Sequence, residues 1–515
     1  MRSCAGRRLF LARAAALAAA PMLQACAARP ARPSFTSDPF KLGIASGSPR
    51  EESVVLWTRL APRPLEGGGL DPVPLPVSWE VAHDDAFRRV ARRGEAVANP
   101  DSAHAVHVEV DGLEPGREYF YRFTCGDAQG PTGRTRTTPR AGEGDERLRF
   151  AFASCQQYEQ GFYVAHRHLA AENPDLILFL GDYIYESSWG RDRVRQHGSA
   201  PPMTLQEYRD RHALYKGDPD LQKAHAAAPW IVTWDDHEVE NDYADDRSEQ
   251  LDPHFLARRT AAYRAFFEHM PLRRSVLLAG GGYRIYDRFS WGALAQFHVV
   301  DDRQYRAYEV CPKPGRGGSN VVGAECTERL DPSRTMFGAA QEAWLDAGFA
   351  ASRAAWNVLA QQTLMAPAGG RGKRGLVHWT DGWDGYPVAR ARLLRSIARS
   401  RLSNPVVIGG DVHAQYFADL HLDPEELASP LVAAELCGTS ITSQGPSEKK
   451  VGEILAANPW IRYGNGSLRG YTLVEMTRSG LDAHLRAVET VKREGAAIRT
   501  AKSVRVEAGR PGLAA

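Results

Sequence analysis

The sequence predicts two folded domains, a small β-sandwich over residues 35–140 and a layered α/β domain over residues 146–494. Short runs of alternating or apolar residues, separated by turn residues, predict the first domain. In the second, apolar strands alternate with helical segments, which is typical of an α/β core. With 515 residues, of which 43% are hydrophobic and 24% charged, the chain can bury a core in each.

The first 34 residues are predicted to be an export signal. Residues 6–11, Gly-Arg-Arg-Leu-Phe-Leu, resemble the twin-arginine signal, and the alanine-rich run after them, interrupted by Arg13, is too short to span a membrane. Residues 23–26 resemble a lipoprotein cleavage box, which would place a lipid on Cys26, whereas residues 25–27 suit an ordinary signal peptidase. We therefore expect the twin-arginine export machinery as a partner and a periplasmic or secreted protein, with a lipid anchor as the open alternative.

The β-sandwich prediction depends on four strands and the turns between them. Glycine and proline turns, such as Gly67-Gly68-Gly69 and Pro115-Gly116, separate expected strands at residues 53–59, 76–82, 104–110 and 118–124. Tyr119 and Tyr121 follow the second of these turns, a pattern similar to that of immunoglobulin-like and fibronectin-like modules. Such a module by itself indicates no particular function.

The α/β domain is predicted from strands at residues 148–153 and 175–180 with a helix at residues 161–171 between them. The alternation continues to about residue 488, and residues 253–270 have a helical pattern. Residues 495–515 are small, basic and polar, and we expect them to form a flexible tail.

Charge and cysteine content exclude some classes of protein. A formal net charge of only +2 argues against dedicated nucleic-acid binding, which needs a basic surface. Seven cysteines are too few and too scattered for a disulfide scaffold. Cys311 and Cys326 flank a glycine-rich loop and, in an exported protein, could close it with a disulfide; two free thiols are the alternative.

Four predicted strands end in residues of the types that bind metal ions. They are followed by Ser154-Cys155, by Gly181-Asp182-Tyr183-Ile184-Tyr185, by Asp235-Asp236-His237-Glu238, and by Gly410-Asp411-Val412-His413. Ligands of open α/β sheets gather outside the carboxyl ends of the strands. Clustered carboxylates repel one another unless a positive charge compensates them. One such segment could be a solvated acidic loop, but four together predict a metal site.

These segments resemble the sequence blocks of metallophosphoesterases. Residues 236–238 and 410–413 are similar to blocks of that superfamily, and the fuller set, with residues 154–155, 181–186 and 233–242, resembles the alkaline phosphatase D family. The start of the sandwich, at residues 40–47 and 54–59, resembles the N-terminal domain of that family. The resemblance implies a metallophosphoesterase-like catalytic α/β domain and extends over nearly the whole mature chain.

The family resemblance also implies a trivalent iron with calcium beside it. Carried over to this sequence, the metal ligands are Cys155, Asp182, Tyr185, Asp236, Asn241, Asp411 and His413. Thiolate and phenolate would suit iron, and hard oxygen ligands would suit calcium. From the residues alone, Tyr185 could equally pack in the core, and core packing is the less favoured alternative for Cys155. The choice of Asp236 over Asp235 rests on the alignment.

Two further residues are candidate catalytic groups. His237 could be a metal ligand, or it could give a proton or hydrogen bond to the phosphoryl group. Arg303 could hold a substrate phosphate with its planar fork, and a structural Asp–Arg pair is the alternative.

The function that these residues imply is hydrolysis of phosphate esters at alkaline pH, by a metal cluster acting as Lewis acid and source of hydroxide. A phosphodiesterase of phospholipase D type, or one acting on cell-wall polymers, is the alternative enzyme. The alternative from another class is a non-catalytic binder of metal or phosphate.

Overall fold

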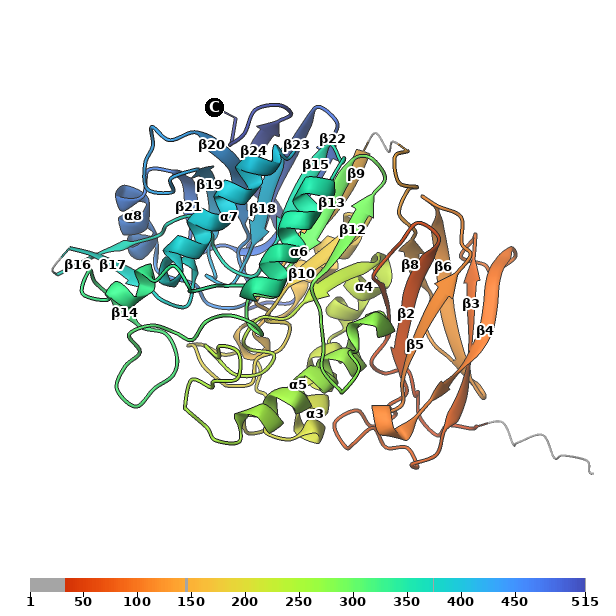
Figure 1. Cartoon of the computed structure of the whole chain (residues 1–515). Helices are drawn as coiled ribbons and strands as arrows, with labels where there is room; N and C mark the ends of the chain where they lie inside the picture. The colour runs from red at the N-terminus through yellow and green to blue at the C-terminus, as the bar shows by residue number, and fades with distance from the viewer. Residues whose placement is uncertain (1–32, 144–146, 374, 515) are drawn as a thin grey trace, which may run out of the picture.

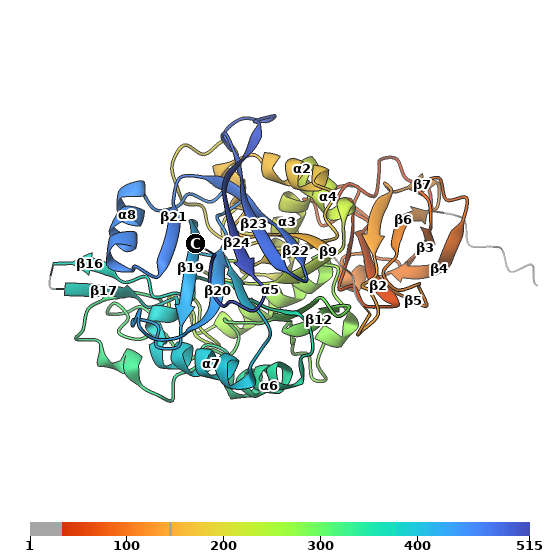
Figure 2. The ribbon, with the colours of Figure 1, turned by 90° about the horizontal axis from the view of Figure 1, so that it is seen from above.

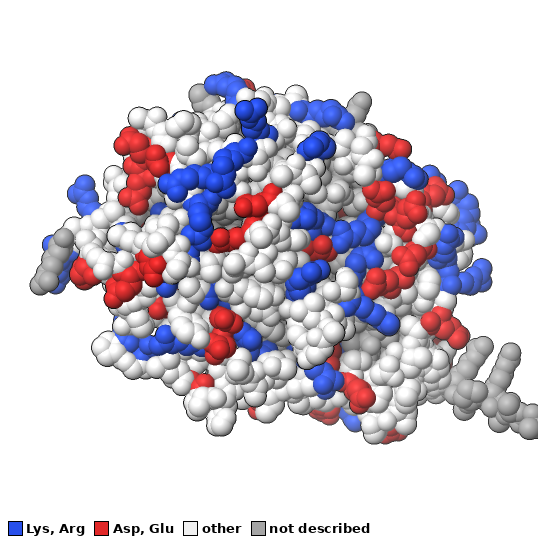
Figure 3. Space-filling model, viewed as in Figure 1, with Lys and Arg blue, Asp and Glu red and all other residues white. Residues whose placement is uncertain are grey.

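The computed structural model describes residues 33–143, 147–373 and 375–514 (Figure 1). The predicted twin-arginine signal and Cys26 lie outside the described residues. Within the described ranges, we find no helix with the length and apolar character needed to cross a bilayer. On the face shown in Figure 3, basic and acidic side chains are interspersed, which agrees with the small net charge of the sequence.

The α/β region contains two large sheets. In the first, which has nine strands, three central strands run parallel: β9 (Arg147–Ala153), β10 (Leu176–Leu180) and β11 (Trp230–Thr233). The second has seven strands, in the order β12 (Asp287–Trp291), β13 (Ala295–Val299), β15 (Trp356–Ala360), β18 (Pro405–Gly409), β20 (Leu431–Cys437), β19 (Gln415–His421) and β21 (Ile461–Asn465). All five residues of β10 are buried, as expected for a parallel strand that is covered on both faces.

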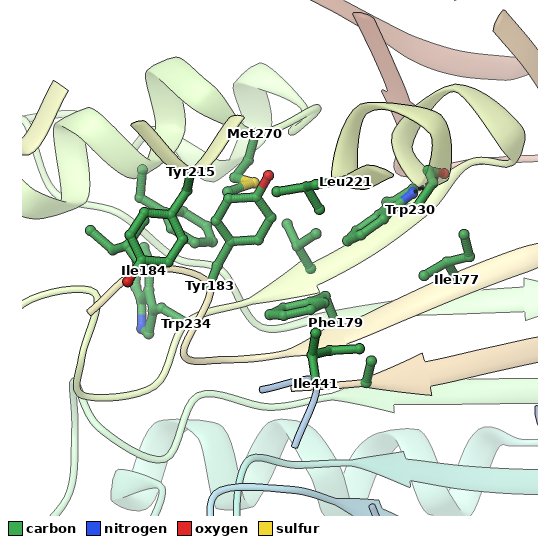
Figure 4. Packing of buried hydrophobic residues seen from close by; sticks show 14 of the residues in the cluster. Ile177, Phe179, Tyr183, Ile184, Tyr215, Leu221, Trp230, Trp234, Met270 and Ile441 are labelled. Atoms are coloured by element: carbon green, nitrogen blue, oxygen red, sulfur yellow. Dashed lines mark hydrogen bonds between the residues drawn. The ribbon is translucent and has the colours of Figure 1, made fainter. Parts of the chain in front are cut away.

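Helices cover the outer faces of both sheets, so the region has four layers (Figure 2). An apolar core in which Phe150 and Phe297 meet edge to face at 5.3 Å joins the two sheets. The first sheet is covered by α2 (Val164–Ala171), α3 (Leu205–Lys216), α4 (Pro219–Ala227) and α5 (Phe255–His269), with the packing shown in Figure 4. The second is covered by α6 (Gly338–Ala351) and α7 (Pro387–Ser400). The predicted layered α/β fold is thus present.

The N-terminal region is joined to the first sheet. That sheet continues from β11 into β1 (Ile44–Gly47), β2 (Ser53–Arg59) and β5 (Ala105–Asp111). Gly47 lies opposite Trp230, where a Cβ atom would be 2.6 Å from the Trp230 carbonyl oxygen, so only glycine permits this approach. The two predicted domains therefore share one sheet.

A second layer packs against this extension. It contains β3 (Leu75–Ala82), β4 (Val90–Ala98), β6 (Glu118–Cys125), β7 (Ala128–Gln129) and β8 (Gly133–Arg136). Val54 and Leu56 of β2 share one buried cluster with Val81 and Tyr121 of this layer. The sequence did not predict β4, and the immunoglobulin-like or fibronectin-like character of the region stays a prediction.

The prediction of a flexible tail is wrong for residues 498–507. Residues 498–507 form β24 (Ile498–Glu507), which pairs along β23 (Gly480–Val488) at the edge of the first sheet; β23 in turn pairs with β22 (Arg469–Thr477). Polar composition suggested fraying, but antiparallel pairing satisfies the backbone while one face stays exposed. Val506 on the other face is 2% exposed and packs in the core between the sheets.

A small sheet lies at one side of the α/β region. It contains β14 (Val321–Val322), β17 (Gly375–Trp379) and β16 (Gly370–Gly372), and α8 (Glu448–Ala457) lies against β16 (Figure 1). The predicted disulfide between Cys311 and Cys326 is present and closes the loop that leads to β14.

The role of β24 gives a stability prediction. Replacing Val506 with Ala should lower the free energy of unfolding by about 2 kcal/mol, because buried methyl groups are lost and a cavity remains. The exposed Arg499 on the same strand is the matched control, and Arg499→Ala should change the free energy of unfolding by less than about 0.5 kcal/mol. Urea unfolding of both variants measures the difference; a frayed segment would show none.

Candidate metal centre

The predicted ligands meet where the strands of the two sheets end. Because β9, β10 and β11 are parallel, their carboxyl ends lie at one edge, and β18 of the facing sheet delivers its following residues to the same place. Four non-glycine residues there have positive φ angles: Cys155 (60°), Asp182 (57°), Asp411 (63°) and His413 (54°). Such angles are uncommon and tend to cluster at functional sites.

One group brings together Cys155, Asp182 and His413, whose ligand atoms all lie within 4.8 Å of one another. The Tyr185 hydroxyl donates to Asp182 Oδ2 at 2.7 Å and is 3.0 Å from His413 Nε2. His413 Nδ1 donates to the carbonyl oxygen of Gln444 at 3.1 Å, which leaves the Nε2 lone pair facing the group. A soft thiol, a phenol and an imidazole therefore converge on one carboxylate.

Carboxylates form the rest of the cage. Asp182 also groups with Asp235 and Asp411, and separately with Asp236 and His237, again with ligand atoms within 4.8 Å of one another. Within the described residues, Asp182 Oδ1, Asp235 Oδ2 and Asp411 Oδ2 are buried without a hydrogen-bond partner. Burial, and then neighbouring Asp381, raise the pKa of Asp411 well above its usual value.

These observations test whether the residues present suit metal ions. Unpartnered buried carboxylate oxygens carry a desolvation cost that a cation would remove. The donor set combines a thiol, a phenol and an imidazole on one side with carboxylates and the His237 ring on the other. The cage therefore fits a metal cluster with one softer and one harder position.

Glu238 ties two walls of the cage together. Its carboxylate accepts hydrogen bonds from the backbone N–H groups of Asp182 at 3.1 Å, Asp235 at 2.8 Å and Tyr183. Burial, reinforced by Asp182, raises the pKa of Glu238 to about 8. The segments after β10 and β11 are thus held by a side chain that the sequence placed in the acidic stretch without naming it a ligand.

His237 is oriented by a carboxylate that the sequence did not single out. Its Nδ1 lies 2.7 Å from Glu186 Oε2, and its ring lies on that of Tyr185 with centroids 4.1 Å apart. Burial opposes protonation, but Glu186 raises the pKa of His237 well above its usual value. Glu186 Oε1 also accepts from the Asn241 backbone N–H at 3.2 Å. His237 and Asn241 both line a cavity whose wall also includes Asp236, Asp411 and His413.

Arg303 lies behind the cage and does not line the cavity. Its side chain is fully buried, donates to Asp381 at 2.6 and 2.8 Å, and donates through Nε to Asp235. The expectation that Arg303 holds a substrate phosphate is therefore corrected in favour of the structural Asp–Arg pair. The Arg303 guanidinium already donates to Asp235 and Asp381, and its positive charge compensates these acids, which support the site.

Other contributors are visible only in three dimensions. Asp242 and Asp381 form a further group with Asp236, with ligand atoms within 4.8 Å of one another. Ser443, far along the chain, donates to the Tyr185 hydroxyl at 2.8 Å. Asp242 stands in the acidic stretch after β11, so the sequence indicated it as a possible ligand. Asp381 and Ser443 lie outside the four ligand-rich strand ends.

Comparison with known proteins places the chain in a family. Residues 150–485 match the model of the PhoD-like phosphatases, and residues 25–139 match that of their N-terminal domain. The chain belongs to the PhoD-like phosphatase family. It is 46% identical over 495 residues to alkaline phosphatase D of Bacillus subtilis (strain 168), covering 94% of this chain and 83% of that relative. It is a phosphoric ester hydrolase.

Solved structures agree with this assignment. A structure of PhoD superposes with a TM-score of 0.89 at 45% identity, covering 94% of this chain and 93% of that one. Purple acid phosphatase PPD1 from yellow lupin (Lupinus luteus) seeds superposes with a TM-score of 0.58 at 10% identity, covering 90% and 74%. That second likeness shows a shared fold alone.

The role of Arg303 gives a prediction. Arg303→Met should lower the free energy of unfolding by about 3–5 kcal/mol, because Asp235 and Asp381 would stay buried without their counter-charge. The control is Arg505→Met, which removes the exposed ion pair with Asp482 and should lower the free energy of unfolding by less than about 1 kcal/mol. Urea unfolding at matched metal content measures both, and wild-type stability of Arg303→Met would contradict the structural role.

Proposed function

We propose that this phosphatase is an exported enzyme that hydrolyses phosphate esters at alkaline pH with trivalent iron and calcium. The observation that supports the metals most is the convergence of Cys155, Tyr185 and His413 on Asp182, with mainly carboxylate ligands on the other side. Residues 6–11 support export, and Cys26 is the site at which a lipid anchor would be attached.

The ligand assignment divides the cage in two. Cys155 and Tyr185 would be the anionic ligands of iron, and Asp182 would bridge the metals. Asp236 and Asn241 would serve calcium, and Asp411 and His413 would complete the cluster. Burial and Asp182 raise the pKa of both the Cys155 thiol and the Tyr185 phenol well above their usual values. A strongly charged cation is thus needed to bring either into its anionic form.

When bound, such ions would polarise a phosphoryl oxygen and lower the pKa of a water molecule. The protein's own groups then position the substrate and move protons. His237, with Nδ1 engaged by Glu186, presents Nε2 to the cavity and donates a hydrogen bond or proton to the phosphate ester. Glu238 keeps the segments that carry Asp182 and Asp236 in fixed relation.

The metal content and colour of the purified protein test this function. Protein that holds iron and calcium should hydrolyse simple phosphate monoesters and lose activity on chelation, and its iron-bound phenolate should absorb visible light. Tyr185→Phe should bleach that band. Tyr183→Phe is the matched control. The Tyr183 hydroxyl lies 2.7 Å from His225 Nε2 and is not among the predicted ligands, so this substitution should leave the colour unchanged.

Two results would contradict the proposal. A colourless, zinc-only protein with full activity would exclude the iron assignment. A protein fully loaded with iron and calcium that hydrolyses no phosphate ester would instead be a metal or phosphate binder. Comparing a simple monoester with phosphatidyl and cell-wall polymer diesters distinguishes the phosphatase from the alternative phosphodiesterases.

A second prediction decides the role of His237. His237→Asn should lower kcat by about 100- to 10,000-fold while bound iron and calcium stay unchanged, because a proton donor is lost and the cage is kept. Glu186→Gln should have a smaller effect, about 10- to 100-fold, through the orientation of the ring. Metal analysis beside steady-state kinetics measures this. Loss of metal together with activity in His237→Asn would make His237 a ligand.

A further inference from the structure

The cavity that contains the metal ligands continues beyond them into an apolar part. It has a volume of about 860 Å³, and Asp236, His237, Asp411 and His413 line only one portion of it. The lining also contains apolar and aromatic side chains, which we call the apolar part: Leu364, Val377, Trp379, Trp383, Tyr416 and Ile454; polar residues such as Thr363, Asp384 and Lys450 line the same cavity. The metal cage does not use these residues, so their presence in the same cavity needs another explanation.

The walls of this apolar part come from elements outside the metal cage. Val377 and Trp379 belong to β17, Ile454 belongs to α8, and Leu364 lies in the segment that follows β15. Hairpin β16–β17 and α8 lie together at the side of the molecule (Figure 1). The region is therefore an addition beside the strand ends.

The segment after β15 is held in place by buried hydrogen bonds. Glu435 accepts from the backbone N–H groups of Met365 at 2.6 Å and Ala366 at 2.7 Å. Trp460 Nε1 donates to the Pro367 carbonyl at 2.7 Å, and Asn458 Nδ2 donates to the Gly369 carbonyl at 2.8 Å. This wall is preformed, as is usual in small-molecule sites.

One cation lines the apolar part. A Cβ atom on Gly370 would lie 2.7 Å from Lys450 Nζ, so the absence of a side chain at Gly370 leaves room for the ammonium group beside the hairpin. Within the described ranges, Lys450 has no ion-pair partner, whereas Arg258, which also lines the cavity, is paired with Glu240 at 2.9 Å. The ammonium group is available to an anion.

We propose that this part of the cavity binds the alcohol portion of the phosphate ester, and that it favours an apolar chain or ring followed by a negatively charged group. The inference rests on the proposed function, because the phosphate itself would lie at the metal cage. Apolar walls would remove the chain from water, and Lys450 would pair with the anion beyond it. Substrate preference would thus be set by residues that take no part in the hydrolysis.

The test is a series of alkyl phosphates given to the metal-loaded, full-length enzyme. Along ethyl, butyl, hexyl and octyl phosphate, kcat/KM should rise by up to about fourfold per methylene group, which is the effect of burying a methylene group. Val377→Asp and Ile454→Ala should each reduce the ratio of octyl to ethyl phosphate kcat/KM by about tenfold or more. A flat series in the wild-type enzyme would overturn the inference.

Lys450 is tested by hexyl phosphate that ends in a carboxylate. Lys450→Ala should lower kcat/KM for this substrate by about fivefold relative to uncharged hexyl phosphate. The neighbouring Lys449, which does not line the cavity, is the matched control, and Lys449→Ala should change neither value. Equal effects on the charged and uncharged substrates would remove Lys450 from the proposal.

Binding separates failure of the inference from failure of the proposed function. Trp379 and Trp383 line the cavity, so ligands that enter it should change the tryptophan fluorescence. Octyl phosphate should bind more tightly than ethyl phosphate even if neither is hydrolysed. Tighter binding without turnover would contradict the proposed function alone, and equal binding of the two would contradict the subsite.

Discussion

The structure depends on keeping several acidic side chains buried at one place. Asp182, Asp235, Asp236 and Asp411 meet where β10, β11 and β18 end; the first three are buried and Asp411 is half-buried. Burial of like charges is costly without compensation. Two features of the surroundings are related to that cost. Several buried carboxylate oxygens have no hydrogen-bond partner, and the Arg303 guanidinium donates to the carboxylates from behind the cage.

The protein compensates the negative charge of these carboxylates more on one side of the site than on the other. Arg303 neutralises Asp235 and lies 3.6 Å from Asp236, where it lowers the pKa of Asp236 against the effect of burial. Among the described residues, no lysine or arginine forms an ion pair with Asp182, whose hydrogen-bonding and ion-pair partners are Tyr185 and His413. The side near Cys155 and Tyr185 thus lacks the guanidinium that the Arg303 side already has, and it is the position that we propose for the more highly charged ion.

The cavity combines this polar cage with a second, apolar environment. Catalytic groups come from the strand ends of the two large sheets, whereas the apolar walls come from the small hairpin sheet, α8 and the segment after β15. In our proposal, these peripheral elements, and not the central strands, decide which ester is accepted.

The sequence by itself determined the alternation of strands and helices, the four strand ends rich in ligands, the disulfide and the family. Each is a local pattern, and parallel strands bring their carboxyl ends together without further information. The tertiary structure decided the rest. Residues 495–515 looked like a tail because β24 is polar and mostly exposed, so its sequence carries little strand signal, and antiparallel pairing with β23 supplies its backbone partners. Arg303 stood next to acids in the chain, but its buried contacts with Asp235 and Asp381 come from other segments. Glu186, Glu238 and Ser443 gained their roles in the same way, because hydrogen bonds between distant segments leave no periodic trace in a sequence.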